Sequence, residues 1–171
     1  DSLVVDGGAT ATGRIVDADG QLTVDLRDGR LAVTNTETVN LTGLNVGAKG
    51  VLAVSIDPTA TGPRLAVAGA ATVATGAQVD LTLTGISKGQ KAYQIIQAQS
   101  LSVGQAGATL GGAPWLYQAS LRTDAAAGSL FVDVRPKTAT ELGLNRSGTQ
   151  AFGAVFEALD KDDRIEAAFL S

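Results

Sequence analysis

Short runs of alternating apolar and polar residues fill the chain from its start to about residue 135, and they constrain the fold more than any other feature. The clearest runs cover residues 22–26, 52–56, 79–83 and 130–134, with turn-forming Gly, Asn or Asp residues close by. Alternation with a period of two puts every second side chain on the same face, which is typical of a strand with one buried face. The sequence therefore predicts β structure for the first three quarters of the chain.

A glycine two positions before an apolar residue opens several of these runs. The pattern recurs at residues 20–22, 29–31, 50–52 and 128–130. Glycine is the residue that tight turns tolerate best, so we expect a turn before each of these strands.

A longer repeat bears on how the strands are arranged. Leu22, Leu44 and Leu65 are 22 and 21 residues apart, Val33 and Val54 are 21 apart, and 20 residues separate each neighbouring pair among Leu81, Leu101 and Leu121. This is the length of one turn of a solenoid. Aromatic residues make up only 4% of the chain, whereas a two-sheet sandwich usually has more large aromatic anchors. We expect a single-stranded parallel β-helix with its rungs in residues 1–92, and a sandwich is the alternative.

Residues 93–135 read as a cap. They contain three of the larger aromatic side chains, Tyr93, Trp115 and Tyr117, together with a glycine-rich stretch at 104–112. The last rung of a solenoid exposes an open core and unpaired strand edges, so bulky side chains and hairpins are needed to cover it.

The pattern becomes helical over residues 136–171. Residues 138–141 (Thr-Ala-Thr-Glu) and 147–150 (Ser-Gly-Thr-Gln) both fit a capping box at a helix start. Helical spacing then aligns one apolar set, Phe152, Val155, Phe156 and Leu159, and after Asp160, Asp162 and Asp163 a second set, Ile165, Ala168 and Phe169. We expect two or three short helices, with the first apolar face docked on the side of the solenoid and the acidic residues acting as caps.

Composition excludes several kinds of chemistry. The chain has no Cys and no His, which removes disulfides, thiolate nucleophiles and the commonest metal ligand and general base. The formal net charge of −4 argues against a nucleic-acid partner, which would need clustered Lys and Arg. Because the chain contains no Met and lacks a basic signal-peptide region, we expect it to be processed or part of a longer polypeptide.

The densest group of carboxylates, Asp17, Asp19, Asp25 and Asp28, has two interpretations. Converging carboxylates suit a calcium site or a glycosidase pair, but the spacing lacks the full calcium-loop pattern, and a solvated turn is preferred. Trp115 with Tyr117 could stack against a sugar, although two such aromatics more often close a core. We therefore expect no catalytic, cofactor-binding or metal-binding residues, and no cofactor.

Residues 137–145, followed by 150–152 and 154–160, resemble the segment between the passenger and the translocator barrel of bacterial type V autotransporters. Residues 91–98, with Leu101, look like the last passenger rungs, often called the autochaperone region. The resemblance implies a right-handed parallel β-helix, a place on the extracellular side of the bacterial outer membrane, and two partners in the same polypeptide: upstream passenger rungs and a C-terminal translocator β-barrel.

Three functional hypotheses follow. The preferred one is a non-enzymatic structural and export module that nucleates folding of a surface β-helix and links it to an outer-membrane barrel. The second is a fragment of a β-helix polysaccharide lyase or glycoside hydrolase, which requires the carboxylates at 17, 19, 25 and 28 to converge. The third is an adhesive domain that binds a host or surface ligand.

Overall fold

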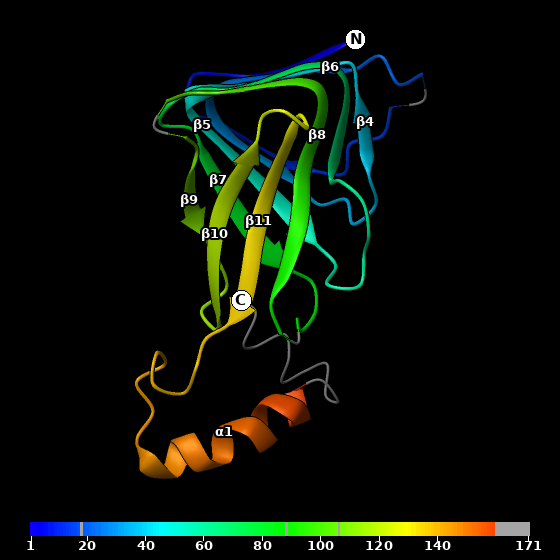
Figure 1. Ribbon diagram of the computed structural model, residues 1–171. Helices are drawn as coiled ribbons and strands as arrows, with labels where there is room; N and C mark the ends of the chain where they lie inside the picture. The colour runs from blue at the N-terminus through cyan, green and yellow to red at the C-terminus, as the bar shows by residue number, and fades with distance from the viewer. Residues whose placement is uncertain (18, 88, 106, 160–171) are drawn as a thin grey trace.

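The computed structural model describes residues 1–17, 19–87, 89–105 and 107–159, and the prediction of an all-β protein is confirmed there (Figure 1). The described residues form eleven strands of one mixed sheet and one helix. In chain order the elements are β1 (Ser2–Val5), β2 (Ala9–Gly13), β3 (Thr23–Val33), β4 (Val39–Leu41), β5 (Gly43–Ile56), β6 (Leu65–Val73), β7 (Gln78–Leu83), β8 (Lys91–Val103), β9 (Thr109–Gly112), β10 (Tyr117–Asp124), β11 (Ser129–Pro136) and α1 (Arg146–Leu159).

Parallel pairing joins the strands from β1 to β9. Strand β1 lies beside β3, β3 beside β5, β5 beside β6 and β7, β6 beside β8, and β7 beside β9, while β2 and β4 pair with β3 and β6. Ser2 pairs with Thr23, Leu44 with Ala71, and Leu65 with Ile96. The chain therefore returns to the ladder after 21, 27 and 31 residues at these places, so the later passes are longer than the first.

The predicted repeat was right in length at the start of the chain and wrong in most of its pairs. Val33 does pair with Val54. Leu44 pairs with Val24 and Ala71, and not with Leu22 or Leu65. Leu101 pairs with Ala71, and Leu121 lies in the antiparallel part of the sheet opposite Val132. The longer later passes break the regular spacing, because extra residues in the connections do not disturb the ladder itself.

Two of the expected turns are bends inside long strands. Gly29 lies within β3 and Gly50 within β5, and the two residues are neighbours in the ladder. Gly29 has a φ of 134°, and a methyl group there would collide with the carbonyl oxygen of Ala9. Figure 1 shows a comparable bend in β8, which rises and then turns over the top of the molecule. The expected turn glycines at 20 and 128 do have positive φ, at 68° and 64°.

One end of the ladder is closed by an antiparallel hairpin. Strand β11 pairs antiparallel with residues 91–97 of β8, and β10 pairs antiparallel with β11. Tyr93 and Tyr117 are buried there. The Tyr93 hydroxyl lies 2.9 Å from the Ser87 hydroxyl, and the Tyr117 hydroxyl oxygen accepts the backbone N–H of Ser87 at 2.9 Å. The expected boundary at residue 92 falls inside β8, so the first strand of the predicted cap also belongs to the parallel ladder.

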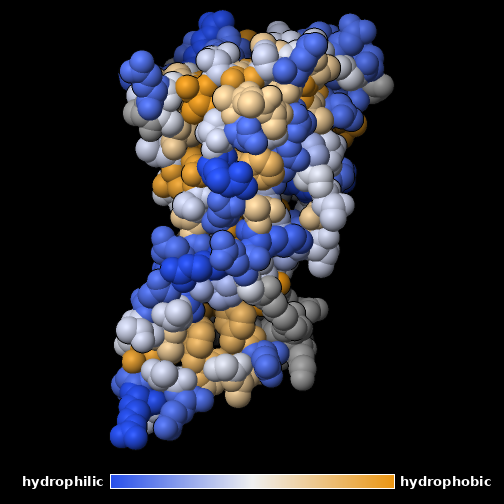
Figure 2. All heavy atoms as spheres, viewed as in Figure 1, coloured by the Kyte–Doolittle hydropathy of each residue, from blue (hydrophilic) through white to orange (hydrophobic). Residues whose placement is uncertain are grey.

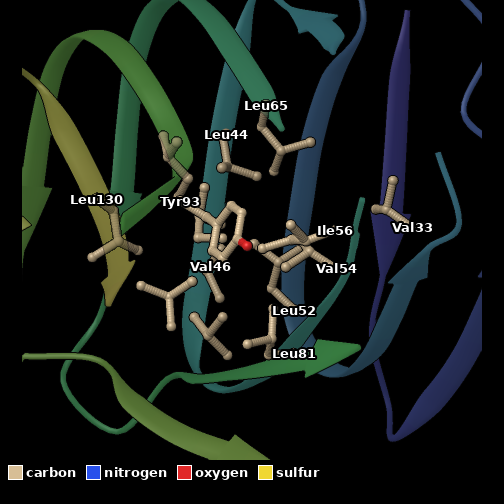
Figure 3. Packing of buried hydrophobic residues seen from close by; sticks show 14 of the residues in the cluster. Val33, Leu44, Val46, Leu52, Val54, Ile56, Leu65, Leu81, Tyr93 and Leu130 are labelled. Carbon is tan, nitrogen blue, oxygen red and sulfur yellow. The ribbon is translucent and has the colours of Figure 1, made fainter. Parts of the chain in front are cut away.

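The core is a column of aliphatic side chains contributed by successive strands. Figure 3 shows those of β5, β6 and β7 pointing into one interior, where the ring of Tyr93 also lies. Leu26, Leu52, Ile56, Leu65 and Leu130 have relative exposures of 0–1%. Each such side chain contributes about 1.5–3 kcal/mol by leaving water, so this column is the main source of stability.

The segment after β11 departs from its prediction in two ways. The capping box at Thr138 and Glu141 forms, with the reciprocal hydrogen bonds expected, but it encloses a turn at residues 139–143 and starts no helix. The helix begins later, where the side chain of Asn145 accepts the N–H of Gly148 at 2.8 Å, so Asn145 and not Ser147 is the N-cap. The predictions for residues 160–171 lie outside the described residues.

Candidate functional site

The open edge of the sheet, formed by β1 and β2, is the first candidate surface. Within the described part of the chain both strands pair only with β3, so their other edges have no strand beside them. The core is also incompletely covered here: Leu3, Ala11 and Ile15 are half-buried and, with Leu31, line a shallow cavity of about 140 Å³. An unpaired edge beside incompletely covered apolar side chains is suited to receive another extended strand.

The side chain of Asn35 links the segment after β2 to the next pass of the chain by hydrogen bonds. Its side chain is 5% exposed and lies beside Ile15, twenty residues earlier. The Asn35 amide oxygen accepts the Ile15 N–H at 2.8 Å, and its amide nitrogen donates to the Ile15 carbonyl at 3.1 Å. One side chain therefore satisfies both backbone groups of Ile15, as a neighbouring strand would. An exposed ion pair between Arg14 and Glu37 adds a second link.

The predicted carboxylate group comes together only in part. Oxygens of Asp17 and Asp19 lie within 4.8 Å of each other and of an Asp1 oxygen, and Asp25 and Asp28 are not in this group. Asp17 accepts the N–H of Leu22 at 2.8 Å, which lowers the pKa of its carboxyl, and Asp19 accepts the N–H of Gln21 at 3.1 Å. These contacts fit the solvated-turn interpretation, in which the carboxylates satisfy backbone donors.

Asp25 has a structural role in the ladder. It accepts hydrogen bonds from Asn45 on the adjacent strand at 2.7 Å and from Arg27 at 2.6 Å. The Asn45 hydrogen bond, followed by that of Arg27, holds the pKa of the Asp25 carboxyl below its usual value. A carboxylate stabilised in this way is a poor proton donor at neutral pH.

A second candidate surface is the apolar groove between the closed end and α1. It has a volume of about 250 Å³ and, in Figure 2, lies in the hydrophobic region between the polar middle of the molecule and the helix. The described residues that line it are all apolar or glycine: Trp115, Leu116, Leu142, Leu144, Gly148, Ala151, Phe152, Val155 and Phe156. The rings of Phe152 and Phe156 lie 5.7 Å apart, so the predicted apolar face of the helix is present.

The structure separates the two aromatics that the sequence suggested as a pair. Trp115 is 55% exposed in the turn before β10, whereas Tyr117 is 2% exposed at the start of that strand. The expectation that Trp115 plugs the core was therefore wrong, because Leu116 and Tyr117 occupy the interior and Trp115 faces the groove. Among the described residues, the groove has no polar side chain that would orient a sugar. Helix α1 docks beside this turn and not along the side of the ladder (Figure 1).

The sequence predicted unpaired strand edges at the end of a solenoid, but it did not identify any residue that stabilises the open end. The fastening role of Asn35 was missed, and an Asn two residues after a strand is too common a turn signal to reveal it. Helix α1, the one helix in the described ranges, is not long and apolar enough to cross a membrane.

Comparison of the chain with protein-family models, with curated proteins and with solved structures found no match.

Proposed function

We propose that the chain is the end segment of a right-handed parallel β-helix and works as a non-enzymatic folding and export module of the autotransporter type. In this role it nucleates the surface-exposed solenoid, and the segment after residue 136 links it to an outer-membrane barrel of the same polypeptide. The barrel and the upstream rungs are the proposed partners, on the extracellular side of the membrane.

The observation that carries this proposal is the difference between the two ends of the ladder. At the β1 and β2 end no strand of the described residues pairs with the outer backbone edge, and Leu3, Ala11 and Ile15 are only half-buried. At the other end an antiparallel hairpin covers half of β8, and Leu130 on β11 is 0% exposed. Because the hairpin occupies the first half of the β8 edge, a complete further pass of the chain can pair at the β1 and β2 end but not at the β8 end.

Templating gives this asymmetry a physical function. A free chain loses the conformational entropy of a whole pass before contacts between neighbouring strands stabilise it. A chain arriving at β1 and β2 instead meets an edge that is already ordered. Each added pass then buries its own aliphatic side chains against the last and exposes a new edge. Folding on the far side of a membrane in this order would favour outward movement of the remaining chain.

The enzyme alternative has less support. It required the carboxylates at 17, 19, 25 and 28 to converge, and Asp25 and Asp28 lie outside the group that Asp17 and Asp19 form with Asp1.

The proposal is tested by making the same deletion at both ends. Leu130→Ala on β11 and Leu26→Ala on β3 each remove a leucine that is 0% exposed, so each should cost about 2–5 kcal/mol. If the closed end folds first, Leu130→Ala slows refolding markedly while Leu26→Ala mainly speeds unfolding. With the chain fused upstream of an outer-membrane barrel, surface display should fall more for Leu130→Ala. A larger folding and display defect in the Leu26 variant would reverse the proposed order and refute the proposal.

A further inference from the structure

The hairpin leaves half of the last ladder strand uncovered. Strand β11 pairs with β8 only over residues 91–97, and within the described ranges residues 100–103 of β8 pair on one side only, with β6. Beyond the bend, therefore, β8 is a second free edge, at the end of the ladder opposite β1. Figure 1 places this part of β8 along the top of the molecule.

This second edge lacks two of the features that normally prevent strands from associating, charged side chains and proline. Natural edge strands carry charged side chains, proline or bulges that discourage pairing. Residues 98–105 contain no charged residue and no proline. The side chains of Gln99, Ser100 and Ser102 are exposed, and Leu101 points inward with 8% exposure. The segment is thus an uncharged strand that alternates polar and apolar faces and has one free row of backbone groups.

We propose that this segment, residues 99–103 of β8, pairs antiparallel with the same segment of a second copy of the chain. The inference is independent of the proposed export function. A two-fold axis brings the same surface of both copies together, so any charged residue in the contact lies near its own copy and is repelled by it. The chain has a net charge of −4, which favours contact through an uncharged patch.

Strand β1, at the other free edge, does not suit self-pairing. Antiparallel pairing of two β1 strands about their centre would place Asp1 of one copy opposite Asp6 of the other, and Asp17 and Asp19 lie next to Asp1. Like charges facing each other across a strand pair are destabilising. The charge distribution therefore disfavours self-pairing through β1. Strand β2 at the same edge has no charged residue, and it is the competing edge that the Thr10→Lys variant tests.

Sedimentation equilibrium of the purified chain tests this pairing. A contact of a few backbone hydrogen bonds is weak, so the monomer–dimer equilibrium should be followed from roughly 10 µM to 1 mM. Ser102→Lys places a charge on the proposed edge without touching the core, and it should weaken dimerisation at least tenfold. Thr72→Lys is the matched control, because Thr72 is exposed and pairs with Ser102 one strand further in. Thr10→Lys charges the other free edge, on β2.

The expected result is a dimer in the wild type and in the Thr72 and Thr10 variants, and a monomer in the Ser102 variant with an unchanged circular dichroism spectrum. Amide exchange in residues 98–105 should also slow as wild-type concentration rises. A wild type that stays monomeric throughout, or a dimer that Thr10→Lys abolishes and Ser102→Lys does not, would overturn the proposal. If Ser102→Lys fails to fold, the concentration dependence of exchange decides alone.

Discussion

Replacing Asn35 by Ala should detach the open end of the ladder. The change removes both hydrogen bonds between the Asn35 side chain and Ile15, at 2.8 and 3.1 Å. The backbone N–H and C=O of Ile15 then lose the partner that Asn35 provides. An unsatisfied buried polar group costs about 1–3 kcal/mol. Because Ile15 itself is half-buried, water will reach one of the two groups, and we expect a net loss of about 2 kcal/mol.

The loss should be local as well as global. In a solenoid each pass contacts only its neighbours, so the end pass can open while the rest stays folded. A local cost of about 2 kcal/mol corresponds to a roughly 30-fold faster exchange of the β1 and β2 amides. The melting temperature should fall by about 4–8 °C if the whole chain unfolds together. Hydrogen exchange with mass spectrometry and a thermal melt distinguish the two cases.

Asn45→Ala is the matched control. Asn45 also bridges neighbouring strands, but it is exposed and its partner is the Asp25 carboxylate at 2.7 Å. Its removal should cost no more than about 0.5 kcal/mol. Equal effects of the two substitutions would mean that the burial of the Asn35 hydrogen bonds is unimportant, and the reasoning above would be wrong.

Two further predictions concern the closed end and the segment that follows it. Gly128→Ala should destabilise the hairpin by about 2 kcal/mol or more, because φ is 64° and the new methyl group would meet the carbonyl oxygen of Ala98; Gly143→Ala, with φ of 70° and open space around it, should cost about 1 kcal/mol in a urea titration. The hydrogen bonds from Arg135, followed by those from Thr138, lower the pKa of Glu141 from 4.5 to about 2. Its contribution to stability is therefore complete above about pH 4.5 and disappears as the pH falls through about 2, so the slope of stability against pH between these values should become shallower in Glu141→Gln, and an unchanged slope would contradict this role.

Local patterns in the sequence predicted the strands well. The runs at 22–26, 52–56, 79–83 and 130–134 all fall within or largely within observed strands, because alternation reflects which face of a strand is buried. Glycine was less informative: Gly20 and Gly128 lie in turns, but Gly29 and Gly50 lie at bends inside strands. Both settings favour glycine, one for its φ and the other for close approach of backbones, so sequence cannot separate them.

The helical segment also had one feature that the sequence predicted and one that it did not. Its apolar face was readable from the spacing of Phe152, Val155 and Phe156, but its start was not. Ser147 and Asn145 are both competent caps, and the turn at residues 139–143, held by Glu141 with Thr138 and Arg135, determines which one is used. The capping box that encloses this turn was readable from the sequence, whereas the ion pair of Glu141 with Arg135 on β11 was not.

The amino-acid sequence by itself determined that this protein is made of strands with one buried face, that it has an aliphatic core, and that thiol and imidazole chemistry are excluded. These properties depend on residue type and on neighbours within a few positions. The partner of each strand, the unequal passes of 21, 27 and 31 residues, the exposure of Trp115 and the free edges at β1 and β8 were decided only by the tertiary structure. Pairing depends on how residues distant in sequence share one interior, and the connections can vary in length without altering that contact.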